Sequence, residues 1–211
     1  MAKNIIFFTL IFLGVAAPAF AQAAQGIDPY RSVATVKVYK AGLLGGFGHD
    51  HEIQGPIQQG TVDEEKGTVE LVIDARELKV VDQDLSDKDR SEVQQNMEGP
   101  KVLDVEHFPQ IRFRSTSPKP AGPNKWTVQG ELEIHGQTRP VTLQVERYAG
   151  LGSPAARYRG SIELRQTDFG IHPYGSIGGA IKVKDKIVVG YDVAVQSTAN
   201  SAGDKSSKLR N

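Results

Sequence analysis

Two histidines flank an aspartate directly after a glycine-rich stretch, in GGFGHDHEIQG (residues 45–55). Histidine is the commonest metal ligand among side chains and titrates nearest physiological pH. On a strand, His49 and His51 share one face, with Cα atoms roughly 6.5–7 Å apart, which a chelated metal can bridge. Zinc takes three or four ligands, so at least one more must come from elsewhere. The other histidines are His107, His135 and His172. Alternatively, the pair forms hydrogen bonds within a loop, and Asp50 orients one imidazole.

Other patterns that carry catalysis lack their required partners. The segment HEIQG has Gly55 where the zinc-protease pattern has its second histidine. No Lys-Ser or Lys-Thr follows the glycines at 42, 45, 46 and 48, so they do not form a nucleotide-binding loop. The chain has no cysteine, which excludes catalysis by a thiol. The sequence therefore predicts a protein that is not an enzyme.

The N-terminus predicts export. Lys3 is the only charge before a long apolar run, and Ala19-Phe20-Ala21 has the small-x-small form of a signal-peptidase site. We expect residues 1–21 to be a cleaved signal peptide, which leaves no stable membrane span in a periplasmic protein. The 25 basic and 25 acidic residues balance, so nothing directs the protein to nucleic acid.

Most of the mature chain alternates between apolar and polar residues. The pattern is clear in TVELVIDA (68–75), KWTVQGELEIHG (125–136) and KIVVGYDVAV (186–195). Period-two alternation indicates strands with one buried and one solvated face. Eight or nine such segments occur, and closing them into a barrel removes the exposed edges. We therefore predict an all-β fold, a closed antiparallel barrel of about eight strands.

One segment has helical signals instead. Ser86 is a predicted N-cap with Asp89 three residues later, and Val93 and Met97 lie four apart on one helical face. Gly99-Pro100 then stops the helix. The sequence thus predicts one short α-helix inserted in the β domain.

The connections and the C-terminal end complete the expected organisation. His135-Gly136 is predicted to form a hairpin turn, and Asp63-Glu64-Glu65 a solvated turn. Residues 198–211 are polar and aperiodic, as is typical of a disordered tail. The barrel domain is expected to occupy residues 22–197.

Three ordered blocks resemble the signature segments of the YceI-like family. They are LDVEHFPQIRF (103–113), GELEIHGQTRPVTL (130–143) and LRQTDFGI (164–171). The resemblance implies an exported, lipocalin-like barrel that holds a polyisoprenoid lipid in an elongated apolar cavity. The histidine stretch departs from it, because typical members have no histidines there.

The resemblance assigns the inward-facing residues to a ligand cavity, whereas alternation alone fits a hollow barrel and a solid core equally well. The expected lining residues are Val36, Val38, Leu71, Ile73, Phe113, Trp126, Leu132 and Ile134. The ligand is expected to be an isoprenoid lipid, a quinone or a prenyl phosphate. Phe47 would pack on its chain, and His49 and His51 would donate hydrogen bonds to its head group.

Two other functions are consistent with the same residues. In one, the protein binds a metal or haem through His49 and His51, and the barrel is the scaffold. In the other, the barrel has a solid core, binds nothing and has a structural or stress-related role. Assembly into a homodimer is left open by the sequence.

Overall fold

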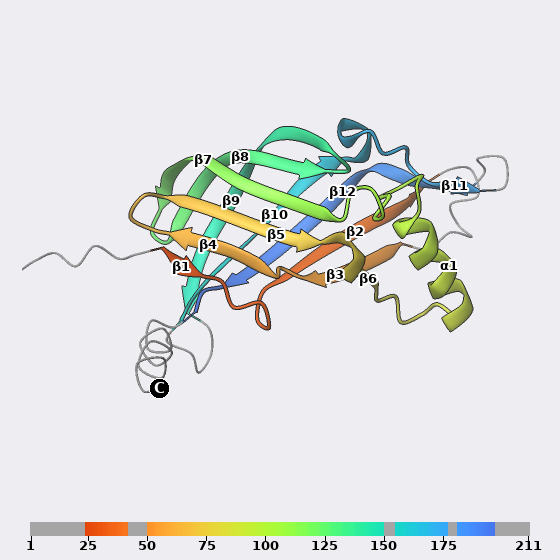
Figure 1. Cartoon of the computed structure of the whole chain (residues 1–211), viewed down its shortest axis with the longest axis horizontal. Coiled ribbons are helices and arrows are strands. Elements are labelled where there is room, and N and C mark those ends of the chain that lie inside the picture. The colour runs from red at the N-terminus through yellow and green to blue at the C-terminus, as the bar shows by residue number, and fades with distance from the viewer. Residues whose placement is uncertain (1–23, 42–49, 150–154, 177–180, 197–211) are drawn as a thin grey trace, which may run out of the picture.

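The computed structural model describes residues 24–41, 50–149, 155–176 and 181–196, most of them in antiparallel strands (Figure 1). The strands are β1 (Gln25–Gly26), β2 (Val33–Ala41), β3 (His51–Pro56), β4 (Gln59–Asp63), β5 (Thr68–Asp74), β6 (Lys79–Val80), β7 (Gln110–Gly122), β8 (Lys125–Ile134), β9 (Gln137–Ala149), β10 (Ala156–Arg165), β11 (Gly175–Ser176) and β12 (Ile181–Ala194). The helices are α1 (Asp87–Glu98) and the 3-10 turns η2 (Ala75–Glu77) and η3 (Gln166–Phe169). The predicted signal peptide (1–21), the predicted tail (198–211), Phe47 and His49 lie outside the described residues.

The sheet closes on itself. The strands pair in the order β1-β4-β5-β7-β8-β9-β10-β12-β2-β3-β6. Only residues 57–58 separate β3 from β4, and only η2 and Leu78 separate β5 from β6. Strands β4 and β5, near one end of the order, therefore continue directly along the chain into β3 and β6 at the other end. A bridge between Ile27 and Val195 also joins the residue after β1 to the residue after β12. Eight long runs of chain thus enclose one interior, which confirms the predicted closed barrel.

Tight turns set the register of the long hairpins. His135 and Gly136 join β8 to β9 with φ values of 50° and 68°, as the predicted hairpin requires. The turn between β7 and β8 is also tight. Gly122 still pairs with Lys125, and Asn124 takes the left-handed conformation with φ 57°. The inward-facing residues of these strands are therefore held in a defined order along the barrel.

Helix α1 covers one end of the barrel and has the predicted boundaries. The Ser86 hydroxyl accepts the Asp89 N–H at 3.1 Å, and Gly99 ends the helix. Met97 is buried, and Val93 packs beside it against the barrel. Gln94 holds the helix to the unpaired side of β6, because its Oε1 accepts the Val80 N–H at 2.8 Å. No helix among the described residues is long and apolar enough to cross a membrane.

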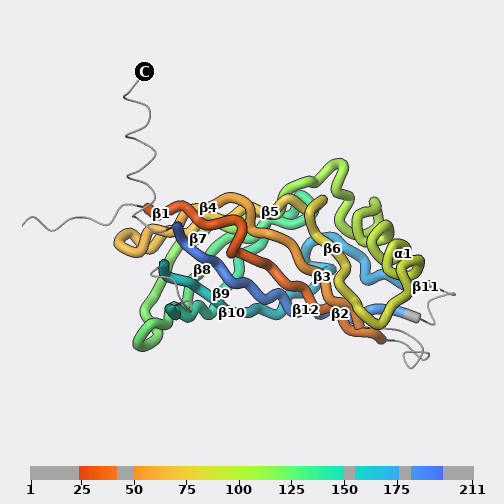
Figure 2. The backbone as a smooth tube through the Cα atoms, turned by 90° about the horizontal axis from the view of Figure 1, so that it is seen from below, coloured from red at the N-terminus to blue at the C-terminus, as the bar shows by residue number. Residues whose placement is uncertain are grey.

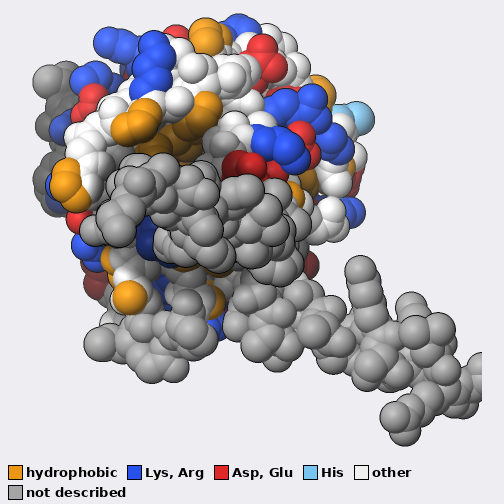
Figure 3. All heavy atoms as spheres, turned by 90° about the vertical axis from the view of Figure 1, so that its left-hand side faces the viewer, with side chains coloured by type: hydrophobic (Ala, Val, Ile, Leu, Met, Phe, Trp, Pro, Cys, Tyr) orange, Lys and Arg blue, Asp and Glu red, His pale blue; other side chains and the backbone are white. Residues whose placement is uncertain are grey.

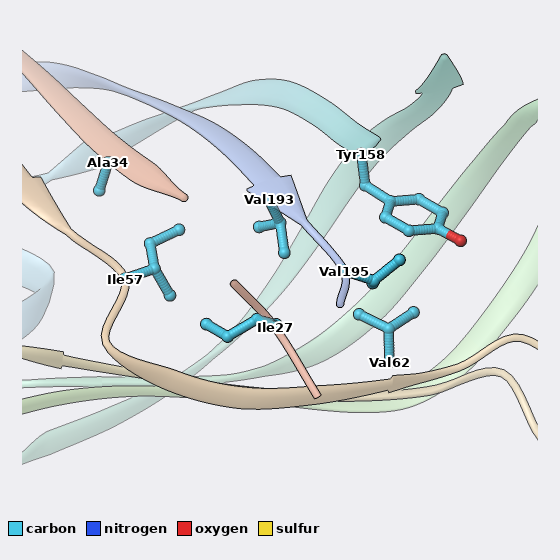
Figure 4. Close-up of a cluster of buried hydrophobic side chains, with 7 residues drawn as sticks. All are labelled: Ile27, Ala34, Ile57, Val62, Tyr158, Val193 and Val195. Carbon is cyan, nitrogen blue, oxygen red and sulfur yellow. The ribbon is translucent and has the colours of Figure 1, made fainter. Parts of the chain in front are cut away.

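The two ends of the barrel differ. Helix α1 lies at one end, and β1 with the β4–β5 and β7–β8 turns lies at the other (Figures 1 and 2). At the β1 end, seven buried side chains from five chain segments pack together (Figure 4). They are Ile27, Ala34, Ile57, Val62, Tyr158, Val193 and Val195. This cluster packs β1 and the β3–β4 bend against β10 and β12.

The β4–β5 turn contains a buried aspartate, so the expectation of a solvated turn is wrong for Asp63, which is 4% exposed. Its carboxylate accepts the Lys66 backbone N–H at 2.9 Å and the Lys66 ammonium at 3.1 Å. These bonds lower the pKa of Asp63.

A pH dependence follows from that lowered pKa. The stabilisation by Asp63 is present above about pH 4, where the carboxyl ionises even in the unfolded chain, and is lost as pH falls through its lowered folded pKa. We expect Asp63→Asn to lower Tm at pH 7. The difference in Tm between the variant and the wild type should become smaller in acid. Thermal unfolding of both proteins from pH 7 to pH 3 measures this, and a constant gap would contradict it.

Candidate functional site

The barrel contains an apolar cavity at its α1 end, here called the inner cavity. Its volume is about 170 Å³. Seven of the predicted lining residues surround it: Val36, Val38, Leu71, Ile73, Phe113, Leu132 and Ile134. Met97, Leu103 and Phe169 cover it at the α1 end. The barrel is therefore hollow at the positions that alternation directs inward.

The polar side chains that line the inner cavity are bonded to the protein backbone. Gln166 donates from Nε2 to the Lys184 carbonyl at 2.8 Å, and Tyr191 donates from its hydroxyl to the Gln144 carbonyl at 2.8 Å. Burial raises the pKa of the Tyr191 hydroxyl, which stays protonated as a donor. A ligand in this cavity would meet almost only hydrocarbon.

A second space, the outer chamber, opens toward the β4–β5 turn and has a volume of about 360 Å³. Trp126, the eighth predicted residue, lines it together with residues 63–67 of the turn. Figure 3 looks onto this end of the barrel and shows hydrophobic side chains gathered around a hollow. The chamber is thus apolar inside and polar at the turn.

Four side chains line both spaces and form a waist between them. They are Leu71, Phe113, Leu143 and Tyr191, from β5, β7, β9 and β12. Gly130 lies beside this waist, where an added Cβ would come within 2.6 Å of both the Phe113 ring and the Arg114 carbonyl oxygen. Glycine at that position lets the Phe113 ring lie against β8.

A polar cluster borders the outer chamber. The Tyr158 hydroxyl donates a short hydrogen bond to Glu64, and Arg147 Nε lies 3.4 Å from the same carboxylate oxygen. Burial, together with the nearby Glu64 carboxylate, raises the pKa of Tyr158. Glu64 therefore connects the β4–β5 turn to β9 and β10 on the opposite wall.

Sequence reasoning missed Glu64, Tyr158 and the position of Tyr191 at the waist. Tyr191 was recognisable as inward-facing from the alternation in KIVVGYDVAV. Glu64 and Tyr158 are 94 residues apart, and no local pattern pairs them. Only the closed barrel brings these two side chains together.

His51 is held outside the two spaces by a buried aspartate. Its Nδ1 lies 2.7 Å from Asp82 Oδ2, and the other Asp82 oxygen accepts the Glu52 backbone N–H at 2.6 Å. His51 is not among the residues that line the inner cavity or the outer chamber. Asp50 accepts the Lys40 backbone N–H at 2.8 Å. Asp82 therefore takes the orienting position expected of Asp50.

The remaining histidines have other local partners. His107 Nδ1 lies 2.9 Å from Asp104 Oδ1, and the ring of His135 packs edge-on against Phe108 at 4.8 Å between centroids. His172 is exposed. Within residues 24–41, 50–149, 155–176 and 181–196, no group of three histidine or acidic residues is arranged to hold a metal ion.

The chain also matches a known protein family over most of its length. The profile of the YceI-like domain matches residues 26–196. The chain belongs to the YceI-like family. The expected membership is thereby confirmed, and the three sequence blocks lie within the matched range.

Curated relatives of the family match over different lengths. A UPF0312 protein of Vibrio parahaemolyticus is 27% identical over 183 residues, covering 82% of this chain and 92% of its own length. A UPF0312 protein of Pseudomonas putida is 36% identical over 78 residues, 35% of this chain and 41% of its own.

Two solved structures share the barrel. BcnA of Burkholderia cenocepacia has a TM-score of 0.61 at 19% identity, covering 81% of this chain and 99% of its own. The YceI protein of Campylobacter jejuni has a TM-score of 0.50 at 11% identity, covering 92% of this chain and 94% of its own. At these identities the likeness establishes the fold of this YceI-like chain.

Proposed function

We propose that this YceI-like protein is an exported, non-enzymatic carrier that holds an isoprenoid lipid, a quinone or a prenyl phosphate, in the inner cavity and outer chamber. The hydrocarbon chain lies in the inner cavity, and the polar head lies in the outer chamber, toward its polar β4–β5 turn. The observation that carries the proposal is the inner cavity, whose lining is almost wholly hydrocarbon.

Size and chemistry both support this assignment. The two spaces, of about 170 and about 360 Å³, reach together the range of roughly 300–1,000 Å³ typical of ligand sites. Each methylene transferred from water into such a cavity contributes about 0.8 kcal/mol, so a prenyl chain binds without charge pairing. Membership of a family of lipid-binding barrels supports the same ligand class.

The test is native mass spectrometry of the protein purified from the periplasm without detergent. We expect an adduct in the mass range of a prenyl lipid, retained on desalting and lost on denaturation. A protein that carries no adduct and takes up neither a quinone nor a prenyl phosphate on incubation would refute the proposal. In the same spectra, a chain that begins after Ala21 would support export, and a doubled native mass would support a homodimer.

The geometry of His51 favours a second candidate function, the binding of a metal or haem by His49 and His51. A carboxylate at one ring nitrogen is the arrangement that orients metal-binding imidazoles, and Asp82 stands 2.7 Å from His51 Nδ1. Nε2 of His51 is then the nitrogen for the metal. Neutral imidazole ligands suit zinc, copper and haem iron.

Metal analysis of the purified protein separates the two candidates. The second candidate requires stoichiometric metal, or haem absorbance, that is lost in His51→Ala and retained in His107→Ala, a histidine with its own aspartate partner. Metal-free protein that acquires neither zinc, copper nor haem on incubation would exclude that function and leave the lipid proposal untouched.

A further inference from the structure

Strands β9 and β10 are paired over only part of their length. The two strands pair from Ala156↔Ala149 only as far as Arg159↔Glu146. Beyond that point each stays bonded to its other neighbour, β9 to β8 as far as Gln137 and β10 to β12 as far as Arg165. We call the unpaired stretch, residues 140–145 of β9 against 160–165 of β10, the seam.

Particular side chains interrupt the ladder at the seam. Continued register would offer the Gln144 carbonyl to β10, but the Tyr191 hydroxyl takes it at 2.8 Å. A Cβ at Gly160 would collide with both that carbonyl and that hydroxyl, so glycine leaves room for the tyrosine. Alternate residues of a strand face the same neighbour, so Pro140, four residues before Gln144, faces β10 with a nitrogen that has no proton.

Grooves lie outside the seam, and parts of the barrel interior form their floor. One, of about 580 Å³, includes Ile162, Leu164 and Phe169, which also line the inner cavity. Another, of about 880 Å³, includes Trp126 and Tyr191, which also line the outer chamber. Water in such open grooves can satisfy the unpaired backbone groups.

The rim of the groove of about 580 Å³ is charged. Lys186 pairs with Glu163 at 2.8 Å and Arg165 with Asp185 at 3.5 Å. Arg139 donates to the Thr138 carbonyl and to Gln137 Oε1, and has no carboxylate within 4 Å among the described residues. A groove with a charged rim and an apolar base is complementary to a lipid with a polar head and a hydrocarbon chain.

We propose that the seam is a lateral entrance through which the hydrocarbon chain of the ligand passes into the inner cavity. This inference rests on the proposed lipid-binding function and adds a route to it. A chain that enters sideways reaches the cavity between Val141 and Ile162. A chain that entered along the barrel axis from the outer chamber would have to thread its full length past Phe113 and Tyr191 at the waist.

The absence of cysteine from the chain allows the seam to be closed by a single introduced disulfide. Extending the register from Arg159↔Glu146 places Thr142 opposite Glu163, and both face outward. The test variant is Thr142→Cys/Glu163→Cys. The matched control, Gln129→Cys/Thr142→Cys, staples two outward-facing residues that are already paired between β8 and β9. If mass analysis finds free thiols after oxidation, a short bis-methanethiosulfonate reagent closes the seam variant, because each cysteine thiol displaces a methanesulfinate group and forms a disulfide that a reductant can later cleave.

Trp126, the only tryptophan, lies in the outer chamber and reports arrival of a quinone by fluorescence quenching. Delipidated protein is mixed in a stopped-flow instrument with a ubiquinone bearing a two-isoprene tail. Closing the seam should slow quenching by at least about tenfold, because uptake would then require another opening of the barrel. Removing the cross-link should restore the rate, and the control should match the wild type.

The outcomes separate the two proposals. Wild-type uptake rates in the closed seam variant would overturn the lateral entrance while the lipid-binding function stands. A wild-type protein that binds neither the quinone nor a prenyl phosphate at equilibrium would overturn the binding function itself. A control variant slowed as much as the seam variant would also overturn the entrance, because the effect would then come from stapling as such.

Discussion

Leu71→Asp should abolish lipid retention and leave the barrel folded. Leu71 lines both the inner cavity and the outer chamber, so the new carboxylate would stand at the waist in contact with the bound chain. An unpaired carboxylate against hydrocarbon costs several kcal/mol, and each 1.4 kcal/mol is tenfold in affinity, so we expect a loss of at least about 100-fold. Titration with the short-tailed ubiquinone, followed by Trp126 quenching, measures it.

The control for this prediction is Val72→Asp. Val72 is the next residue on β5, lines neither space and faces the outside of the barrel, so it receives the same charge without reaching the ligand. Its affinity should stay within about threefold of the wild type, since the charge lies away from both spaces. Circular dichroism and Tm establish that both variants are folded. A folded Leu71→Asp protein with wild-type affinity would show that the waist does not contact the ligand.

Asp82→Ala should clearly destabilise the folded protein. The Asp82 carboxylate is buried and accepts the Glu52 backbone N–H and the His51 ring, which connects β3 to the segment before α1. Removing it leaves that N–H without its partner, so we expect the free energy of unfolding to fall by about 1–3 kcal/mol. Urea denaturation with a common m-value measures the change.

Glu92→Ala is the matched control for Asp82→Ala. Glu92 is exposed on α1, and alanine is a good helix former, so the free energy of unfolding should change by less than about 0.5 kcal/mol. An Asp82→Ala protein as stable as Glu92→Ala would mean that water replaces the carboxylate at the Glu52 N–H. Asp82 would then not be required to hold the His51 ring in place.

The sequence alone was sufficient to predict the barrel and to identify the residues that face its interior. Strand alternation has a period of two residues, so a few positions such as Val69, Leu71 and Ile73 determine which face is buried. Helix α1 was equally predictable from the sequence, because the Ser86 cap and the Gly99 stop act within one turn of the helix. These signals are local, and the closed fold preserves them.

Tertiary structure alone decided whether the interior is hollow and where the pairing of β9 with β10 ends. Alternation is the same for a solid and a hollow barrel, because the cavity depends on how side chains from opposite strands fill the space between them. The partners of His51 and Tyr158 come from 31 and 94 residues away. The seam likewise depends on Tyr191 reaching the Gln144 carbonyl, 47 residues away, once β9, β10 and β12 are side by side. Such contacts have no period along the chain, since they exist only after closure of the barrel brings distant strands together.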